Sequence, residues 1–559
     1  MNKKLRSNFV RGTSPWAVRR AQWRALGFTD EDMEKPKIAV VNTSSKLAIC
    51  FSHLDGVAEK VSEAIRAAGG LPLEVRTAAP SDFITSPGRR GGYILSARDL
   101  VTNDIEVVVE GAQLDGMVCL TSCDKTVPGH LMAAARLNIP TLMVVCGYQP
   151  SGEYKGEHCD IEEVFLAAGH TAAGKLPVEE LADMADVSIK GPGVCSGMGT
   201  ANSMHIATEA LGMCLPGTAP VAANSDKMFA DVAAAGKRIV EMVEEDLRPR
   251  DIMTPEAFSN SAMSVLAVSG SINCIKHLQA VAVEAGMDLN VYDLFDKLSD
   301  KVPVLAAVRP NGEDSIEAFE AAGGARAVMK QLGDLVNADA MTVSGKTMGE
   351  NLVDATVGDQ NVIRSRENAF SHTPPIVIVR GSLAPGGAII KLGISQDRVF
   401  EMTGPARAFD TADEALDCIR NKGVKAGEVV VLKGLGLKGG PGMSTASRVV
   451  FALDGAGLGE EVAVVSDGQN SGLVNRGLVV GEVEPEAAIG GPLGLVEDGD
   501  IISIDARAKT VDLKVSEEEL ARRRERFQVR TSESGGGWLK IYQETVQPLS
   551  SGAVLTKRS

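Results

Sequence analysis

The chain of 559 residues is too long for one ordinary hydrophobic core, so we expect two or more domains. Hydrophobic residues make up 44% of it and charged residues 23%, a composition typical of a globular protein in water. The formal net charge of -16 argues against nucleic acid as its main partner, because a phosphate backbone would repel it.

The sequence contains no apolar run of about 18 or more residues, and residues 1–16 carry no segment suited to a signal peptide. We therefore expect a cytoplasmic protein without a membrane partner. Its nine cysteines should be reduced thiols or metal ligands, since disulfides are rare in that compartment. The 59 glycines and 4% aromatic residues indicate tight loops that suit small-molecule chemistry.

Residues 1–35 are polar, and Trp16 and Trp23 are spaced for one face of a helix that contacts the body or another subunit. Strands and helices then alternate, which predicts a doubly wound α/β domain. The predicted strands are residues 37–43, 71–77, 114–120 and 142–145, and the predicted helices are residues 53–68, 96–110 and 130–137.

The middle of the chain is predicted to be mostly helical. Its helical patterns cover residues 177–187, a helix from about 201, residues 225–245 and residues 255–284, with a second helix start near 270–277. Residues 288–370 are predicted to be mixed α/β without a strong motif.

From residue 373 the sequence changes to short β-rich runs separated by glycines, which predicts a barrel or sandwich. These runs are residues 429–434, 461–467, 477–483, 500–506 and 510–515. Residues 516–527 should form a charged helix, and residues 535–555 a tail that docks on the first domain or on a second subunit. We therefore predict an α/β domain over residues 1–372 and a β-barrel-like domain over residues 373–559.

The most reactive triplet is Cys123, Asp124 and Lys125, which falls on the turn between a predicted strand and helix. Open α/β sheets bind their ligands at such turns, beyond the carboxyl ends of the strands. A thiolate, a carboxylate and an amine crowded together are costly unless something binds them, and a metal is the obvious candidate. The alternative is a capped turn with an ordinary core cysteine.

Cys50 and Cys195 also lie in predicted loops, so three dispersed thiolates could converge at one sheet edge. Three cysteine ligands would leave one iron of an iron-sulfur cluster open, as an iron Lewis acid requires. The spacing alone is weak support for such a site. Cysteines within apolar or helical runs are predicted to be core residues: Cys119, Cys146, Cys214, Cys274 and Cys418. Cys159 has no assignment.

Asp82 and Asp124 are carboxylates suited to a hard cation such as magnesium, whereas Lys125 would first have to be neutralised or modified. Each of them is alternatively a solvated loop charge or part of an ordinary ion pair. Ser471, in a glycine-rich turn after a strand, is either a nucleophile or base or simply a turn residue. The nearby residues 438–442 could cradle an anionic substrate through backbone N–H groups.

Taken together, colinear motifs over nearly the full length resemble the dihydroxy-acid and sugar-acid dehydratase family. They are SCDKTVPG, GPGVCSGMGTANSM, GSLAPGGAIIK, GPARAFD, KGGPGM, SDGQNSG and EPEAAIGGPLGLVEDGDIISID. The resemblance implies an α/β N-terminal domain, a β-barrel C-terminal domain, a homodimer or homotetramer, and an active site between the domains.

The resemblance also implies the site residues. A two-iron two-sulfur (2Fe-2S) cluster would be bound by three cysteines, and Mg²⁺ by two carboxylates and a carbamylated lysine. The cluster ligands would be Cys50, Cys123 and Cys195, and the magnesium ligands Asp82, Asp124 and Lys125. Ser471 would be the base that removes the C2 proton of a 2,3-dihydroxy acid, leaving a 2-keto acid after loss of water.

Two departures from the family pattern affect the predicted substrate and metal. Thr445 stands where family members usually carry a glutamate ligand of magnesium. Arg89 and Arg90 lie in the Asp82 loop, and Gln469 and Asn470 lie beside Ser471, which favours sugar acids as substrates. The alternatives are the branched-chain substrate 2,3-dihydroxyisovalerate and a non-catalytic binding relative.

Overall fold

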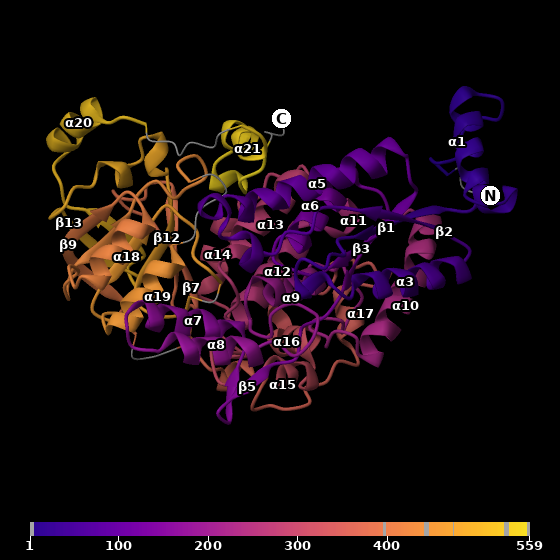
Figure 1. The fold of residues 1–559 in the computed structure, drawn as a ribbon. Helices are drawn as coiled ribbons and strands as arrows, with labels where there is room; N and C mark the ends of the chain where they lie inside the picture. The colour runs from indigo at the N-terminus through magenta and orange to yellow at the C-terminus, as the bar shows by residue number, and fades with distance from the viewer. Residues whose placement is uncertain (1–4, 395–397, 441–445, 473, 530–535, 556–559) are drawn as a thin grey trace.

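The protein is described by a computed structural model that covers residues 5–394, 398–440, 446–472, 474–529 and 536–555. It is a mixed α/β structure with two main sheets, and Figure 1 shows the second sheet, in orange, beside the larger first part of the chain. All strands of the first sheet precede residue 372 and all strands of the second follow it. The domain boundary at residue 372 itself stays a prediction.

The first sheet has four parallel strands in the order β2-β1-β3-β4. Its strands are β1 (Lys37–Asn42), β2 (Leu71–Arg76), β3 (Gly116–Thr121) and β4 (Thr141–Val145). All residues of β1, β3 and β4 are buried, which explains why the sequence shows continuous apolar runs here. The four predicted strands are therefore confirmed.

Helices cover both faces of this sheet, as the predicted doubly wound fold requires. One face carries α3 (Leu54–Ala67) and α10 (Asp226–Glu245), and the other carries α5 (Tyr93–Gly111) and α6 (Thr126–Leu137). The chain leaves β1 towards β2 and leaves β3 towards β4. The loops after β1 and β3 therefore diverge, and a crevice opens between them at the carboxyl edge of the sheet.

Further helices complete the first part of the chain; the second helix start predicted near 270–277 is confirmed, and the strand content predicted for 288–370 is wrong. The helices are α1 (Ser14–Ala25), α2 (Asp30–Glu34), α4 (Asp82–Thr85), α7 (Ile161–Ala172), α8 (Val178–Val187), α9 (Thr200–Ala210), α11 (Pro249–Ile252), α12 (Pro255–Ala267), α13 (Asn273–Glu284), α14 (Val291–Ser299), α15 (Ile316–Ala321), α16 (Gly324–Leu332) and α17 (Met348–Leu352). Residues 255–284 form two helices, because Ser269 adopts a left-handed conformation between them. Within residues 288–370, all described, the chain forms short helices and isolated bridges but no strand.

The second sheet has eight strands in the order β14-β13-β9-β10-β11-β12-β8-β7. They are β7 (Ile376–Val379), β8 (Gly387–Lys391), β9 (Glu401–Phe409), β10 (Val429–Leu432), β11 (Ala463–Ser466), β12 (Val479–Glu484), β13 (Ile501–Asp505) and β14 (Thr510–Leu513). A bridge between Arg380, just after β7, and Thr510 in β14 links the two edge strands. The sheet is thus a nearly closed barrel, as predicted.

Alternate residues of the barrel strands face different cores. In β10, Val429 and Val431 belong to the core inside the barrel, whereas Val430 and Leu432 pack under outer helices. Those helices are α18 (Ala412–Arg420) and α19 (Ser447–Ala456), and α7 from the first part packs against α19. Figure 1 shows α7 beneath α19, where the two parts meet.

The C-terminal tail docks on the first part of the chain, which was one of its two predicted sites. It follows α20 (Glu517–Arg526), and its helix α21 (Trp538–Thr545) packs against α5. Leu95 of α5 and Tyr542 of α21 share a small buried cluster. Arg98, also buried, donates hydrogen bonds to the carbonyls of Gly552 (2.9 Å) and Ala553 (2.8 Å).

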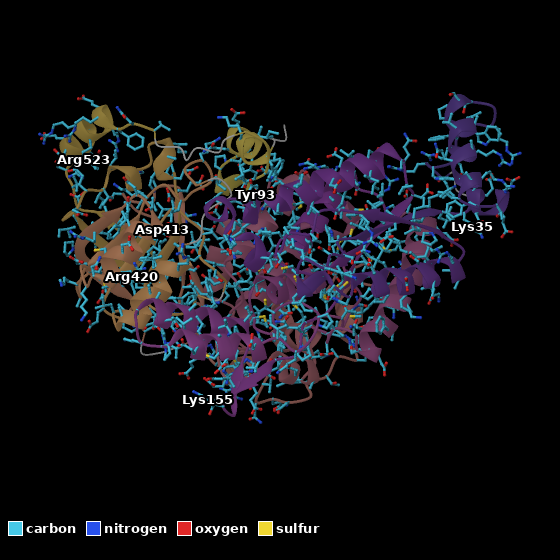
Figure 2. All side chains as sticks on the ribbon, in the orientation of Figure 1. Lys35, Tyr93, Lys155, Asp413, Arg420 and Arg523 are labelled. Atoms are coloured by element: carbon cyan, nitrogen blue, oxygen red, sulfur yellow. The ribbon has the colours of Figure 1, made fainter. Side chains whose placement is uncertain are left out.

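Many charged side chains lie at the surface and the predicted core cysteines are buried, except for one cysteine. Figure 2 shows charged side chains such as Lys155 and Arg420 at the outside of the molecule. Cys119, Cys146, Cys214 and Cys274 are buried as predicted, but Cys418 is only half-buried, because it lies on the outer helix α18. Cys159 is buried in β6 (Glu157–Cys159), which pairs with β5 (Gly152–Tyr154). No helix among the described residues is long and apolar enough to span a bilayer.

Candidate functional site

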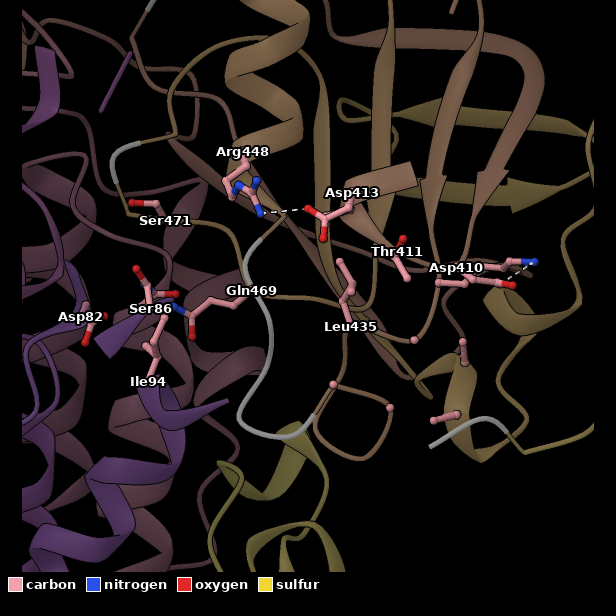
Figure 3. Close-up of a pocket in the computed structure, with 18 of the residues that line it drawn as sticks. Asp82, Ser86, Ile94, Asp410, Thr411, Asp413, Leu435, Arg448, Gln469 and Ser471 are labelled. Carbon is pink, nitrogen blue, oxygen red and sulfur yellow. Dashed lines mark hydrogen bonds and ion pairs between the residues drawn. The ribbon is translucent and has the colours of Figure 1, made fainter. Parts of the chain in front are cut away.

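A cavity of about 1290 Å³ lies where the crevice of the first sheet faces the barrel. Loops of the first part contribute Asp82, Cys123, Asp124 and Cys195 to its lining, and a barrel loop contributes Ser471. In Figure 3, Asp82, Ser86, Gln469 and Ser471 gather at one end of it, and Asp410, Thr411 and Asp413 lie at the other. The cavity therefore brings together residues far apart in the sequence.

The three predicted cluster cysteines converge beside this cavity. Cys50 lies in a short 3₁₀ turn after β1, Cys123 follows β3, and Cys195 precedes α9. The thiols of Cys50 and Cys123 are in hydrogen-bonding contact, which lowers the pKa of Cys50 and raises that of Cys123. Burial raises the pKa of Cys195, with a contribution from the nearby thiol of Cys50.

The three predicted magnesium ligands also lie together. Lys125 is fully buried, and its Nζ atom donates to Oδ2 of Asp82 (2.7 Å) and lies 3.4 Å from Oδ2 of Asp124. Burial raises the pKa of Asp82 to about 7, and the negative charge of Asp124 adds to the rise. Burial opposes the charge of Lys125, but Asp82 and Asp124 outweigh it and raise the pKa of the lysine.

Ser471 lies in the loop between β11 and β12. Its backbone N–H donates to Oγ of Ser447 (2.7 Å), at the start of α19, and the carbonyl of the next residue, Gly472, accepts from Lys391 (2.9 Å). Gln469 of the same loop lines the cavity, and its Oε1 atom is buried without a partner among the described residues. Asn470 is buried but does not line the cavity.

Several residues singled out from the sequence are not assigned by the structure. The side chains of Arg89 and Arg90 lie outside the described residues, although their backbone forms the turn Gly88–Gly91. Thr445 lies outside the described residues altogether. Their predicted roles therefore stay predictions.

The prediction that residues 438–442 cradle an anionic substrate is wrong for the described part of that loop. The N–H groups of Lys438 and Gly439 donate to the carboxylate of Glu486, and the N–H of Gly440 donates to the carbonyl of Gly436. These donors are occupied within the protein, so they hold the loop rather than a ligand.

Two carboxylates shape this loop, the buried Asp467 and the half-buried Glu486, and sequence reasoning missed both. Asp467 accepts hydrogen bonds from the N–H groups of Gly434, Leu435 and Ala487, and Glu486 accepts those of Lys438 and Gly439. Burial raises the pKa of Asp467 to about 6 and that of Glu486 to about 7. Both belong to motifs quoted above, SDGQNSG and EPEAAIGG, and their place in these motifs could have identified them as candidate site residues.

The donor set fits the metal groups that the resemblance implies. Oδ1 of Asp82 is buried with no hydrogen-bond partner among the described residues, so an oxygen remains for a hard cation. A soft metal would stabilise the thiolate form of the three cysteines. Its positive charge would also compensate the negative charges of the neighbouring carboxylates. Lys125 suits a magnesium shell only in a modified form, since an ammonium has no lone pair.

The fold and this arrangement define the class of protein: an α/β enzyme whose site lies between a doubly wound sheet and a barrel. Residues 35–351 match the profile described as dihydroxy-acid/6-phosphogluconate dehydratase N-terminal, and residues 361–553 match its C-terminal counterpart. The chain belongs to this dehydratase family, and it is therefore a hydro-lyase, not a non-catalytic relative.

Full-length relatives support this membership. The chain is 42% identical to the dihydroxy-acid dehydratase of Caldicellulosiruptor saccharolyticus over 553 residues, which cover 99% of this chain and 100% of the relative. It is 43% identical to the dihydroxy-acid dehydratase of Pyrococcus furiosus over 556 residues, with the same coverage. A dihydroxy-acid dehydratase of Sulfurisphaera tokodaii is 39% identical over 559 residues, covering 99% of each chain.

Proposed function

We propose that this protein dehydrates 2,3-dihydroxy carboxylic acids to 2-keto acids and that its preferred substrate is a branched aliphatic acid such as 2,3-dihydroxyisovalerate. The observation that carries the proposal is the cavity itself. It is lined by Asp82, Asp124 and the thiols of Cys123 and Cys195 as well as by Ser471, so the proposed metal ligands and the proposed base share one small-molecule site.

The substrate preference reverses the sequence-based expectation of sugar acids. Full-length relatives at 39–43% identity are named dihydroxy-acid dehydratases, which supports the branched-chain alternative. Next to Asp82 the cavity is lined by Phe83, Ile94 and Phe165. Apolar groups at this position favour an aliphatic substrate over a polyhydroxylated one, because sugar hydroxyls would lose their hydrogen bonds to water there.

Two sets of side chains, each of which lies close together in the structure, would hold the metal groups. Cys50, Cys123 and Cys195 would bind a 2Fe-2S cluster, and the second set, Asp82, Asp124 and carbamylated Lys125, would bind Mg²⁺. When bound, these groups supply Lewis-acid stabilisation to the substrate carboxylate and to the hydroxyl that departs.

A residue of the chain itself, Ser471, removes the proton from the substrate. Ser471 takes the proton from C2 of the substrate, and its backbone is held in place by Ser447 and Lys391. The C2–C3 double bond forms as the 3-hydroxyl leaves, and Ser471 gives up the proton that it took, which completes the departing water. The resulting enol loses its hydroxyl proton and gains one at C3 to become the 2-keto acid, so one water is the net loss and Ser471 returns to its starting state.

A polar side chain of the barrel also lines the cavity. Gln469 lies in the lining, and its unpartnered Oε1 can accept a hydrogen bond from a substrate hydroxyl. Sugar acids offer more such hydroxyls, so Gln469 is the observation that favours them as the second candidate. The predicted homodimer or homotetramer stays a prediction, which light scattering of the purified protein tests.

The deciding experiment measures 2-keto acid formation by anaerobically purified, magnesium-supplied protein. The substrates compared are 2,3-dihydroxyisovalerate, D-gluconate, D-xylonate, L-arabonate and D-glycerate. We expect the largest kcat/KM for 2,3-dihydroxyisovalerate. A larger value for any sugar acid would overturn the substrate assignment, and no product from any of the acids would overturn the proposed reaction.

A further inference from the structure

Lys391 is a buried lysine whose side chain contacts the serine loop. It is the last residue of β8, only 6% of its surface is exposed, and its Nζ atom donates to the carbonyl of Gly472 at 2.9 Å. Gly472 follows Ser471, so this hydrogen bond lies one peptide away from the proposed base. Lys391 ends the motif GSLAPGGAIIK, but neither the family resemblance nor the proposed metal sites give it a role.

The surroundings of Lys391 leave its charge only partly compensated. The ionisable groups that act on it are Glu162 of α7, Arg398 in the segment after β8, and Cys274 of α13. Among the described residues no carboxylate lies within ion-pair distance of its Nζ atom. Burial lowers the pKa of Lys391 to about 7, although Glu162 favours the charged form. A negative charge developing nearby would therefore be strongly favoured.

The peptide after Ser471 is also confined on its other sides. A Cβ atom at Gly472 would overlap the Ser271 side chain and lie 3.0 Å from Oγ1 of Thr200, so only glycine fits. Ser271 and Thr200 are hydrogen-bonded to each other at 2.9 Å. The segment is thus wedged against the first part of the chain and tied to the barrel through Lys391 and Ser447.

We propose that Lys391 is a positioning residue for Ser471: it holds the Gly472 carbonyl so that the serine faces Asp82 and Asp124, and its positive charge favours the ionised serine hydroxyl. This inference rests on the proposed function. A fixed cation that needs no reorganisation stabilises charge more effectively than water does. No step of the reaction requires Lys391 to touch the substrate.

The first test compares Lys391→Met with Lys391→Arg. Met keeps most of the length and loses the donor and the charge, whereas Arg keeps both. We expect kcat for Lys391→Met to fall about a hundredfold with KM changed less than about threefold, because ground-state binding is not affected. The acid limb of its kcat–pH profile should move up by about one pH unit. The kcat of Lys391→Arg should be about tenfold higher than that of Lys391→Met.

Lys37→Met is the matched control. Lys37 is also a buried strand lysine that donates to a backbone carbonyl, that of Met33, but it lies at the start of β1, at the opposite edge of that sheet from the site. We expect its kcat and pH profile to match those of the wild type once its stability loss is allowed for. Equal losses of kcat in both variants would mean that burial of a lysine matters only for folding, and would overturn the proposal.

A readout without turnover separates this inference from the proposed function. Backbone amide hydrogen exchange over residues 466–480 should be faster in Lys391→Met than in the wild type, and unchanged in Lys37→Met. If the wild type has no dehydratase activity, the proposed function fails while exchange still decides the positioning role. Unchanged exchange together with unchanged kcat in Lys391→Met would overturn the inference.

Discussion

At the scale of single residues, Ser471 and the proposed metal ligands are tied to separate parts of the fold. Ser471 belongs to a barrel loop held by Ser447, whereas Lys125 is locked between Asp82 and Asp124 at the edge of the first sheet. Removing either group should therefore affect the reaction without disturbing the other. This independence makes single substitutions informative.

Ser471→Ala should lower kcat by about a thousandfold, because a positioned general base contributes on this order. Iron and sulfide content should stay at the wild-type level, since no cysteine is changed. Steady-state kinetics and metal analysis of the same preparation check both points. Ser315→Ala, which removes the cap of α15, a helix that contributes no residue to the cavity lining, is the control and should keep full kcat. An unchanged rate in Ser471→Ala would show that another group is the base.

Cys195→Ser should abolish the cluster, because a hydroxyl is a poor ligand for iron at this pH. The variant, purified anaerobically, should lose its brown absorbance and most of its iron and sulfide. Cys418→Ser is the matched control, since Cys418 lies half-buried on α18 and is not one of the three proposed cluster ligands. If Cys195→Ser keeps the iron content of the wild type, the ligand assignment is wrong.

At the scale of elements, the loops that line the cavity are held in place by contacts with neighbouring elements. Glu486 holds the loop at Lys438 and Gly439, and the carbonyl of Gln543 in α21 accepts from Nζ of Lys438 at 3.0 Å. The C-terminal tail therefore supports the cavity wall from outside. Its own attachment depends on Arg98, which is buried beside Asp99.

Arg98→Met should destabilise the protein by about 3–5 kcal/mol and release the tail, because it leaves the carboxylate of Asp99 buried without its partner. Limited proteolysis should then cut within residues 536–555 before any other site, and the urea midpoint should fall. Arg98→Met/Asp99→Asn should recover part of the loss. Arg420→Met removes an exposed ion pair with Asp417 and should change stability by less than about 1 kcal/mol. A tail as protected as in the wild type would contradict this role of Arg98.

At the scale of the whole molecule, one buried ion pair joins the two parts of the chain. Lys276 of α13 and Glu482 of β12 both have fully buried side chains and lie in direct contact. Lys276 also donates to Oδ1 of Asn273 at 2.6 Å, and Asn273 lines the cavity. The pair thus fixes the barrel against the first part of the chain beside the site.

Lys276→Met should weaken this connection by about 3–5 kcal/mol, since Glu482 would be left charged and buried. Urea unfolding followed by far-UV circular dichroism should then separate into two transitions, one for each sheet. Lys276→Met/Glu482→Gln should restore much of the coupling, because the unpaired charge is gone. A single transition with the wild-type midpoint in Lys276→Met would contradict the assignment.

Prediction from sequence succeeded where burial imposes a simple pattern. The strands β1, β3 and β4 are buried throughout and read as continuous apolar runs, and the barrel strands β10 and β11 do so as well. It failed at β9, whose glycine, proline and exposed residues hide the strand pattern. It also missed α7, although Asp160 and Glu163 have capping-box spacing there.

By itself, the sequence determined most of the strands and helices of the two sheets and which reactive residues stand on the turns between them, because periodicity and turn chemistry are local. Only the tertiary structure decided that Cys50, Cys123 and Cys195 meet at one edge of the first sheet and that Ser471 lines the same cavity as Cys123 and Cys195, since this arrangement joins residues far apart in the chain. It alone revealed that Lys125 and Lys391 are buried. The free-energy cost of burying their charges depends on partners that no local pattern specifies.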